Sequence, residues 1–221
     1  PEMKKKNKKP LQKLLGLEEK DTVLFGVVSR LESIKGSDLL VPAAAKIAGS
    51  GCQLAVLGRG NPENERELKK LEEKYPGRIS VSLGFDDTLA RRIYAASDMF
   101  LMPSRYEPCG ISQLIAMRYG SVPIVHRVGG LADTVRDEQS DPGSGTGFTY
   151  VADSANAFVR AISRGIRMYR NDRTGWKGLV RRAMSFDSGW HKSAESYLSL
   201  YEEALAARAS CTCIPNEAGL T

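Results

Sequence analysis

Short apolar runs alternate with longer amphipathic segments along most of this chain, and this alternation restricts the fold more than any other feature. The apolar runs have the length and the β-branched content of strands, and most precede a segment with helical periodicity. The predicted strands are 23–28, 53–57, 79–83, 99–102, 122–125 and 148–151. A short helical pattern is predicted over 11–15, and the longer predicted helices are 37–48, 62–74, 87–96, 111–119, 131–135, 154–169, 176–184 and 192–207. Strands that alternate with helices form βαβ units, so we expect an α/β protein with a mostly parallel sheet.

Six strands of this kind fit one Rossmann-like, doubly wound domain with helices on both faces of the sheet. We expect this domain over residues 11–207, a length typical of one domain. Residues 1–10 contain a lysine cluster and are predicted to be a linker-like basic arm. Residues 208–221 lack periodicity and are predicted to be a disordered tail.

The distribution of charge argues against a nucleic-acid partner. The chain has a formal net charge of +6, of which the lysines of residues 1–10, set against Glu2, supply +4. A terminal lysine cluster is usually a solvated arm rather than a binding surface. No apolar run approaches the roughly 20 residues of a membrane span, and the polar first residues predict no signal peptide. The four cysteines (Cys52, Cys109, Cys211 and Cys213) are too few to suggest a disulfide framework and point to a reducing compartment.

Several common site motifs are absent from the sequence. Gly58-Arg59-Gly60 ends a predicted strand, but Glu63 occupies the third glycine position of a dinucleotide fingerprint, and there is no phosphate P-loop. The two histidines, His126 and His191, have no neighbouring Cys/His cluster, so we predict no metal site. The arginines of the helix 154–169 and its end are predicted to form a solvated face: Arg160, Arg164, Arg167 and Arg170.

The segment 103–111 is the strongest candidate for a functional site. It joins the predicted strand 99–102 to the next helix, at the sheet edge where doubly wound proteins bind ligands. Glu107 supplies its carboxylate, Pro108 disfavours helix at Glu107, and Gly110 lets a ligand approach the backbone. Unpaired amides at the start of the next helix suit an anionic or hydroxyl-rich ligand. An ordinary βα turn is the alternative that these residues leave open.

Three further segments could complete such a site. Arg30 and Lys35 follow the first predicted strand and suit phosphate oxygens, although two surface cations have the same sequence pattern. The turn Gly129-Gly130 precedes a helix and fits either a ligand contact or a simple helix cap. Phe85 follows the end of the third predicted strand, where a base could stack on it or the ring could be half-buried.

Together these segments resemble the C-terminal donor-binding domain of bacterial glycogen synthases and plant starch synthases, which are retaining glucosyltransferases of glycosyltransferase family 5 with the two-domain GT-B fold. The resemblance is carried by Val28-Ser29-Arg30-Leu31 with Lys35-Gly36, by residues 103–114 and 116–120, and by Gly129-Gly130-Leu131-Ala132-Asp133-Thr134-Val135. Weaker similarity extends from about Lys8 to Leu205. The Glu-Pro-Cys-Gly block with a downstream Gly-Gly-Leu is highly specific to this family.

The resemblance implies a role for each candidate residue. Arg30 and Lys35 would hold the diphosphate of ADP-glucose and Glu107 would orient the glucosyl ring, which makes these three the implied catalytic residues. Phe85 would occupy the adenine-stacking position, where the family often has Tyr. The implied contacts to donor sugar and phosphate are Cys109, Gly110, Ile111, Gly129 and Gly130. The resemblance implies no cofactor and no metal, because fixed cations would stabilise the departing ADP. Ile115 stands where many GT-B enzymes have a second Glu, a departure that this synthase family shares.

The implied function is transfer of glucose from ADP-glucose to the non-reducing end of an α-1,4-glucan. The glucan would bind through an N-terminal domain that this sequence does not include, so we expect the chain alone to bind ADP weakly and not to elongate glucan. The implied compartment is a bacterial cytoplasm or a plastid stroma. The alternatives are a synthase that uses UDP-glucose, a non-catalytic nucleotide-sugar or glucan-binding module, and an NAD-binding Rossmann protein.

The last predicted helix, 192–207, would pack on the N-terminal domain in a full-length synthase. Its apolar face includes Tyr197, Leu198, Tyr201 and Leu205. The resemblance therefore implies that this face is exposed or self-associated in the present chain.

Overall fold

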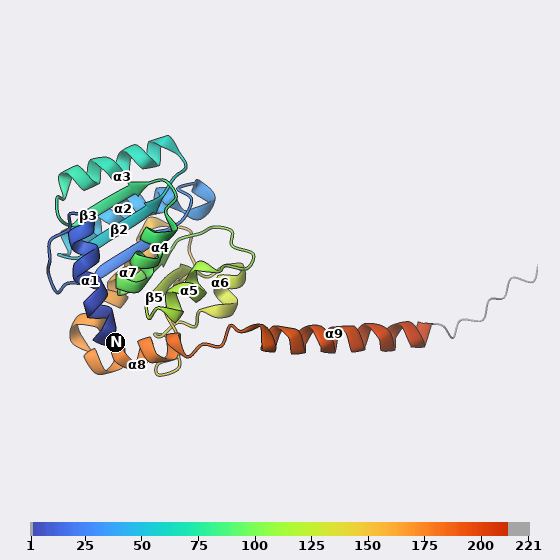
Figure 1. The fold of residues 1–221 in the computed structure, drawn as a ribbon. Helices are drawn as coiled ribbons and strands as arrows, with labels where there is room; N and C mark the ends of the chain where they lie inside the picture. The colour runs from blue at the N-terminus through green and yellow to red at the C-terminus, as the bar shows by residue number, and fades with distance from the viewer. Residues whose placement is uncertain (1, 212–221) are drawn as a thin grey trace, which may run out of the picture. The chain divides into compact units, whose positions relative to one another are not determined.

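A computed structural model describes residues 2–211, which form two compact units divided between Phe186 and Asp187. The first unit contains a six-stranded sheet with the strand order β3-β2-β1-β4-β5-β6. Strands β3, β2 and β5 of this sheet are labelled in Figure 1. Every pair of neighbouring strands is parallel. This order is that of a doubly wound Rossmann domain, so the predicted fold class is confirmed.

The strands are β1 (Leu24–Val28), β2 (Gln53–Gly58), β3 (Ile79–Leu83), β4 (Met99–Met102), β5 (Val122–His126) and β6 (Phe148–Tyr150). The helices are α1 (Glu2–Leu14), α2 (Ser37–Gly49), α3 (Pro62–Lys74), α4 (Asp87–Ala96), α5 (Ser112–Arg118), α6 (Gly129–Thr134), α7 (Ala155–Asn171), α8 (Arg173–Met184) and α9 (Trp190–Cys211), with a 3-10 turn η1 (Ser33–Lys35). The strands match the predicted ranges within one or two residues. The length of α1 and the turn η1 were not predicted, and α6 begins two residues earlier than expected.

The two faces of the sheet pack against different sets of helices. Side chains of a strand point alternately to opposite faces, so Phe25 and Val27 of β1 join one core and Leu24 joins the other. The first core also includes apolar residues of α2 and α7, and the second includes apolar residues of α4 and α5. Burial on both faces explains why the strands have almost continuous apolar sequences.

β1 and β4 are neighbours in the sheet but lead to helices on opposite faces. The chain passes from β1 to α2, whose apolar residues lie in the first core, and from β4 to α5, whose apolar residues lie in the second. The segments that leave these strands therefore diverge, and such a switch point is where open α/β sheets bind ligands. This topology places residues 29–36 and 103–111 at the same edge of the sheet.

The basic N-terminal segment is part of the fold. Lys8 and Asp98 are 5% and 7% exposed, and the Lys8 Nζ lies 2.6 Å from Asp98 Oδ2 and 2.9 Å from the Thr22 carbonyl oxygen. Burial alone lowers the pKa of a lysine, but the Asp98 carboxylate and its hydrogen bond outweigh burial and raise the pKa of Lys8. Lys4 donates to the carbonyl oxygen of Tyr119. The prediction of a linker-like arm over residues 1–10 is therefore wrong for the described residues 2–10, because sequence alone could not show these buried partners.

The predicted domain over residues 11–207 also differs from the structure. The first unit ends at Phe186, and the predicted helix 192–207 is α9 of the second unit. Six large apolar residues of α9, including the four predicted ones, are exposed: Trp190, Tyr197, Leu198, Leu200, Tyr201 and Leu205. Within the predicted tail, residues 208–211 belong to α9, and residues 212–221 lie outside the described part. No helix of the described residues is both long enough and apolar enough to cross a membrane.

The buried Lys8–Asp98 pair makes a testable contribution to stability. Replacing Lys8 by Ala leaves the Asp98 carboxylate buried without its cation, so we expect the free energy of unfolding to fall by about 3 kcal/mol. Urea denaturation measures this change. The control is Lys70→Ala, which removes an exposed ion pair with Glu67 on α3 and should cost at most about 0.5 kcal/mol. Equal losses in the two variants would show that the Lys8 pair does not anchor α1.

Candidate functional site

The segments after β1 and β4 are packed backbone against backbone. Gly36, which follows η1, has φ 70°. A Cβ atom at Gly36 would lie 2.1 Å from the Pro103 carbonyl oxygen. The Arg105 amide donates to the carbonyl oxygen of Ile34 at 2.9 Å. These contacts require glycine at position 36 and hold the two segments side by side.

This packing brings Lys35 and Glu107 into direct contact. The Lys35 Nζ lies 2.7 Å from Glu107 Oε2, and the two side chains are 21% and 13% exposed. The buried Ser104 donates its hydroxyl hydrogen to the same carboxylate oxygen at 3.1 Å. A largely buried carboxylate needs such partners, since an unpaired charge is costly away from water. The cation and the carboxylate that were predicted from separate segments thus form one ion pair at the switch point.

The turn Gly129-Gly130 closes on the other side of Glu107. The Gly130 amide donates to the carbonyl oxygens of Glu107 at 3.0 Å and of Pro108 at 3.2 Å. A Cβ atom at Gly129 would lie 2.2 Å from the Glu107 carbonyl oxygen, and one at Gly130 would lie 1.8 Å from that of Cys109. The Gly130 amide therefore already has hydrogen-bond acceptors within the protein. The two glycines are needed because any side chain would prevent this close approach of the backbones.

The rest of the loop is held by the buried side-chain amide of Gln113. Gly110 has φ 70°, and the Gln113 Nε2 donates to its carbonyl oxygen at 3.0 Å and to Thr134 Oγ1 at 3.1 Å. Gln113 is fully buried, whereas Cys109 and Ile111 are exposed. The loop thus presents Cys109 and Ile111 to solvent beside the Lys35–Glu107 pair.

Arg30 and Phe85 line the same cavity, and the residues that line it include neither Lys35 nor Glu107. Both line a cavity of about 140 Å³ at the ends of β1, β2 and β3, together with Gly58 and Gly84. The ring of Phe85 is 82% exposed. The side chain of Arg30 is 56% exposed and pairs with Glu32 at 3.1 Å. The structure therefore groups Arg30 with Phe85 and Lys35 with Glu107, where the sequence had grouped Arg30 with Lys35.

Sequence reasoning missed the residues that support this site. Ser104 and Gln113 hold the Glu107 loop, and Arg105 bonds to residues of three segments. The His126 Nδ1 lies 3.0 Å from the Ser104 carbonyl oxygen. Ser104, Arg105 and Gln113 lie inside or beside the motif that carries Glu107, and this position was the only indication of their importance in the sequence. Their partners come from distant parts of the chain, so the sequence could not assign their roles.

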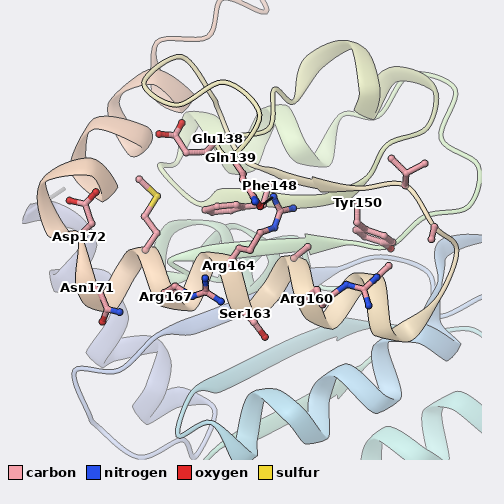
Figure 2. A pocket seen from close by; sticks show the side chains of 15 residues that line it. Glu138, Gln139, Phe148, Tyr150, Arg160, Ser163, Arg164, Arg167, Asn171 and Asp172 are labelled. Atoms are coloured by element: carbon pink, nitrogen blue, oxygen red, sulfur yellow. Dashed lines mark hydrogen bonds between the residues drawn. The ribbon is translucent and has the colours of Figure 1, made fainter.

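A large cavity lies elsewhere, between α7, β6 and the 138–139 segment. Its volume is about 870 Å³, and Figure 2 shows Arg160, Arg164 and Arg167 along α7 near Phe148. Arg164 reaches Asp137 at 2.9 Å, so the prediction of a fully solvated arginine face is wrong at this position. The residues that line this cavity include none of the predicted site residues. Within residues 2–211, no group of three or more His, Cys, Asp or Glu side chains is arranged to hold a metal ion.

The fold is that of a glycosyltransferase domain. Residues 8–176 match the family described as glycosyl transferases group 1, and the chain belongs to this family. Among curated proteins it is 48% identical to the glycogen synthase of Syntrophotalea carbinolica over 205 residues and 43% identical to that of Desulforudis audaxviator over 204 residues. These alignments cover 92% of this chain but only 42% and 41% of the two relatives.

A solved structure supports the same relationship. The catalytic domain of starch synthase IV from Arabidopsis thaliana, bound to ADP and acarbose, is 37% identical and superposes with a TM-score of 0.84. The match covers 92% of this chain and 43% of the plant chain. The predicted resemblance to glycogen and starch synthases is confirmed.

The close approach at Gly130 gives a direct test of the site's construction. A methyl group at this position would overlap the Cys109 carbonyl oxygen, so Gly130→Ala should lower the free energy of unfolding by about 2 kcal/mol. Urea denaturation again provides the measurement. Gly49→Ala is the matched control, since a Cβ atom there has open space around it at the end of α2, and it should be neutral or stabilising by up to about 1 kcal/mol. A Gly130→Ala protein as stable as the wild type would contradict the described packing.

Proposed function

We propose that this chain is the donor-nucleotide half of an enzyme that transfers glucose from ADP-glucose to the non-reducing end of an α-1,4-glucan, with retention at the anomeric carbon. The observation that carries the proposal is the Lys35–Glu107 pair, held by glycine-dependent contacts at the switch point of the sheet. Its support is the identity to glycogen synthases and the ADP bound by the plant starch synthase. The chain spans about two fifths of these relatives, so we assign the glucan acceptor to the rest of the enzyme.

Lys35 and Glu107 would exchange partners when the donor binds. In the structure the ammonium group is held by the carboxylate at 2.7 Å. A diphosphate carries more negative charge than one carboxylate and would compete for this ammonium group. Glu107 would then be free to accept hydrogen bonds from the hydroxyls of the glucosyl ring, with Ser104 still holding the carboxylate. Before the donor binds, the two opposite charges thus compensate each other in the ion pair.

The cavity beside Phe85 would take the nucleoside. Its volume of about 140 Å³ and the exposed aromatic ring suit a flat base stacked on Phe85. Arg30 lines the same cavity and would turn from Glu32 towards the diphosphate. The donor would then extend from Phe85 past Arg30 to Lys35, and its glucose would lie beside Glu107.

In the reaction, the bond between the anomeric carbon and the diphosphate oxygen breaks and negative charge grows on the leaving ADP. Once they bind the diphosphate, Lys35 and Arg30 place two positive charges where this charge develops, so they stabilise it more in the transition state than in the bound substrate. The oxygen of an acceptor hydroxyl forms the new bond to the anomeric carbon, and the proton of that hydroxyl passes to the leaving diphosphate oxygen. Water must be excluded, since it would hydrolyse the donor, and in this proposal the rest of the enzyme closes over the site.

Removal of either cation tests the diphosphate site. We expect Arg30→Ala and Lys35→Ala each to weaken ADP binding by about 1.5–3 kcal/mol, the value of a hydrogen bond to a charged group. Isothermal titration calorimetry of the chain with ADP measures the effect. Lys70→Ala, an exposed lysine of α3, is the control and should bind ADP like the wild type. Unchanged affinity in both Arg30 and Lys35 variants would remove them from the site. Tighter binding of UDP than of ADP would favour a UDP-glucose enzyme.

Removal of Glu107 separates binding from transfer. Glu107→Ala frees Lys35 from its ion pair, so ADP affinity should be unchanged or higher, while incorporation of labelled glucose by the full-length enzyme should be lost. Loss of ADP affinity in Glu107→Ala would instead indicate that Glu107 only holds the loops together.

The chain alone should bind ADP weakly and incorporate no glucose, and activity should return when the remaining part of the enzyme is added in trans.

A further inference from the structure

Arg105 lies two residues before Glu107, and its side chain joins segments that follow three different strands. Its two terminal nitrogens donate to Asp38 at 2.6 and 2.8 Å, and its Nε donates to Asp153 at 2.8 Å. One of the terminal nitrogens also donates to the Ser33 carbonyl oxygen at 2.6 Å. Asp38 lies in the first turn of α2, Ser33 begins η1, and Asp153 follows β6. A single guanidinium group therefore connects the segments after β1, β4 and β6.

The geometry of this contact distinguishes it from an ordinary surface ion pair. Exposed pairs contribute little, but a planar guanidinium that bonds to one carboxylate through two nitrogens and also to a second carboxylate is geometrically specific. The hydrogen bonds from Arg105 lower the pKa of Asp38, and the two carboxylates raise the pKa of Arg105. Asp38 and Arg105 thus both stay charged at neutral pH.

The anchors of Arg105 lie on both sides of Lys35 in the sequence. Ser33 is two residues before it, and Asp38 is three residues after it. At the other end, Arg105 is adjacent to Ser104, which donates to Glu107. The guanidinium bonds to none of the atoms that form the Lys35–Glu107 pair. Its own bonds are therefore preserved when that pair opens.

We propose that Arg105 is a positioning residue, which keeps the Lys35 segment fixed against the Glu107 segment while their ion pair opens to admit the phosphates of the donor. This inference rests on the proposed function. The ion pair is itself a link between the two segments, and ligand binding removes that link. Arg105 supplies a second link that does not depend on it, so Lys35 can change partners without displacement of the loop that carries Glu107.

A competing explanation needs no role for Arg105. The contact of Gly36 with the Pro103 carbonyl oxygen also holds the two segments together and could suffice alone. The two explanations differ in one measurable respect. If Arg105 acts through the position of Lys35, its removal should matter for ligand affinity only while Lys35 is present.

A double-mutant cycle tests this difference. We would measure ADP affinity by calorimetry for the wild-type chain, Arg105→Gln, Lys35→Ala and the double variant, each first shown to be folded by its urea unfolding curve. Arg105→Gln should weaken ADP binding at least about fivefold in the wild-type background and less than about twofold in the Lys35→Ala background. Arg105→Lys keeps the charge but lacks the planar guanidinium that bonds to Asp38 through two nitrogens, so it should restore affinity only in part.

Two further variants separate positioning from stability. Arg164→Gln removes an arginine that bonds to Asp137 through two nitrogens, to Gln139 and to the Thr149 carbonyl oxygen. It contacts none of the partners of Arg105, so this change should lower stability without changing ADP affinity. Asp153→Ala removes the bond from the Arg105 Nε while the bonds to Asp38 and Ser33 remain, and it serves if Arg105→Gln does not fold. It should weaken ADP binding about twofold or more in the wild-type background only.

The outcomes distinguish the two proposals. If the wild type binds ADP and Lys35→Ala weakens binding, equal effects of Arg105→Gln in both backgrounds, or no effect at all, would overturn the positioning role and leave the proposed function standing. If the wild-type chain does not bind ADP, the proposed function fails and the positioning role fails with it.

Discussion

The segments that follow β1, β4 and β5 approach one another so closely that only glycine fits at the points of contact. Gly36 faces the Pro103 carbonyl oxygen, and Gly129 and Gly130 face those of Glu107 and Cys109. These contacts carry no charge, yet they set the distance between Lys35 and Glu107. The site is therefore first a feature of backbone packing, and its charged groups are placed by that packing.

The charged groups of the site then compensate one another. A carboxylate as buried as that of Glu107 requires partners, and Lys35 and Ser104 supply them. The same requirement explains Lys8 with Asp98 and Arg164 with Asp137 elsewhere in the fold. In each case a cation that the sequence presents as a surface residue is bound to a carboxylate far away in the chain. The formal net charge of the chain consequently says little about which cations are available to a ligand.

Sequence reasoning succeeded where the controlling interactions are local. Alternating apolar and amphipathic runs predicted the strands, because each strand must bury both faces and each helix one. The same reasoning failed for residues 2–10, since Lys4 and Lys8 look like a solvated cluster until their partners around Tyr119 and Asp98 are known. It also grouped Arg30 with Lys35, which are close in sequence, although Arg30 lies in the cavity with Phe85. Arg105 drew no attention, because its partners at Asp38 and Asp153 belong to other segments.

The sequence by itself determined the α/β class, the order of the elements, and the loop in which Glu107 lies, because these depend on periodicity and on residues adjacent in the chain. The tertiary structure alone decided which cation meets Glu107, how the loops are held, and where the first unit ends. The physical reason is that an ion pair or a backbone contact depends on distance in space. A strand order that sets β1 beside β4 brings residues 35 and 107 within 2.7 Å although 72 positions separate them in the chain.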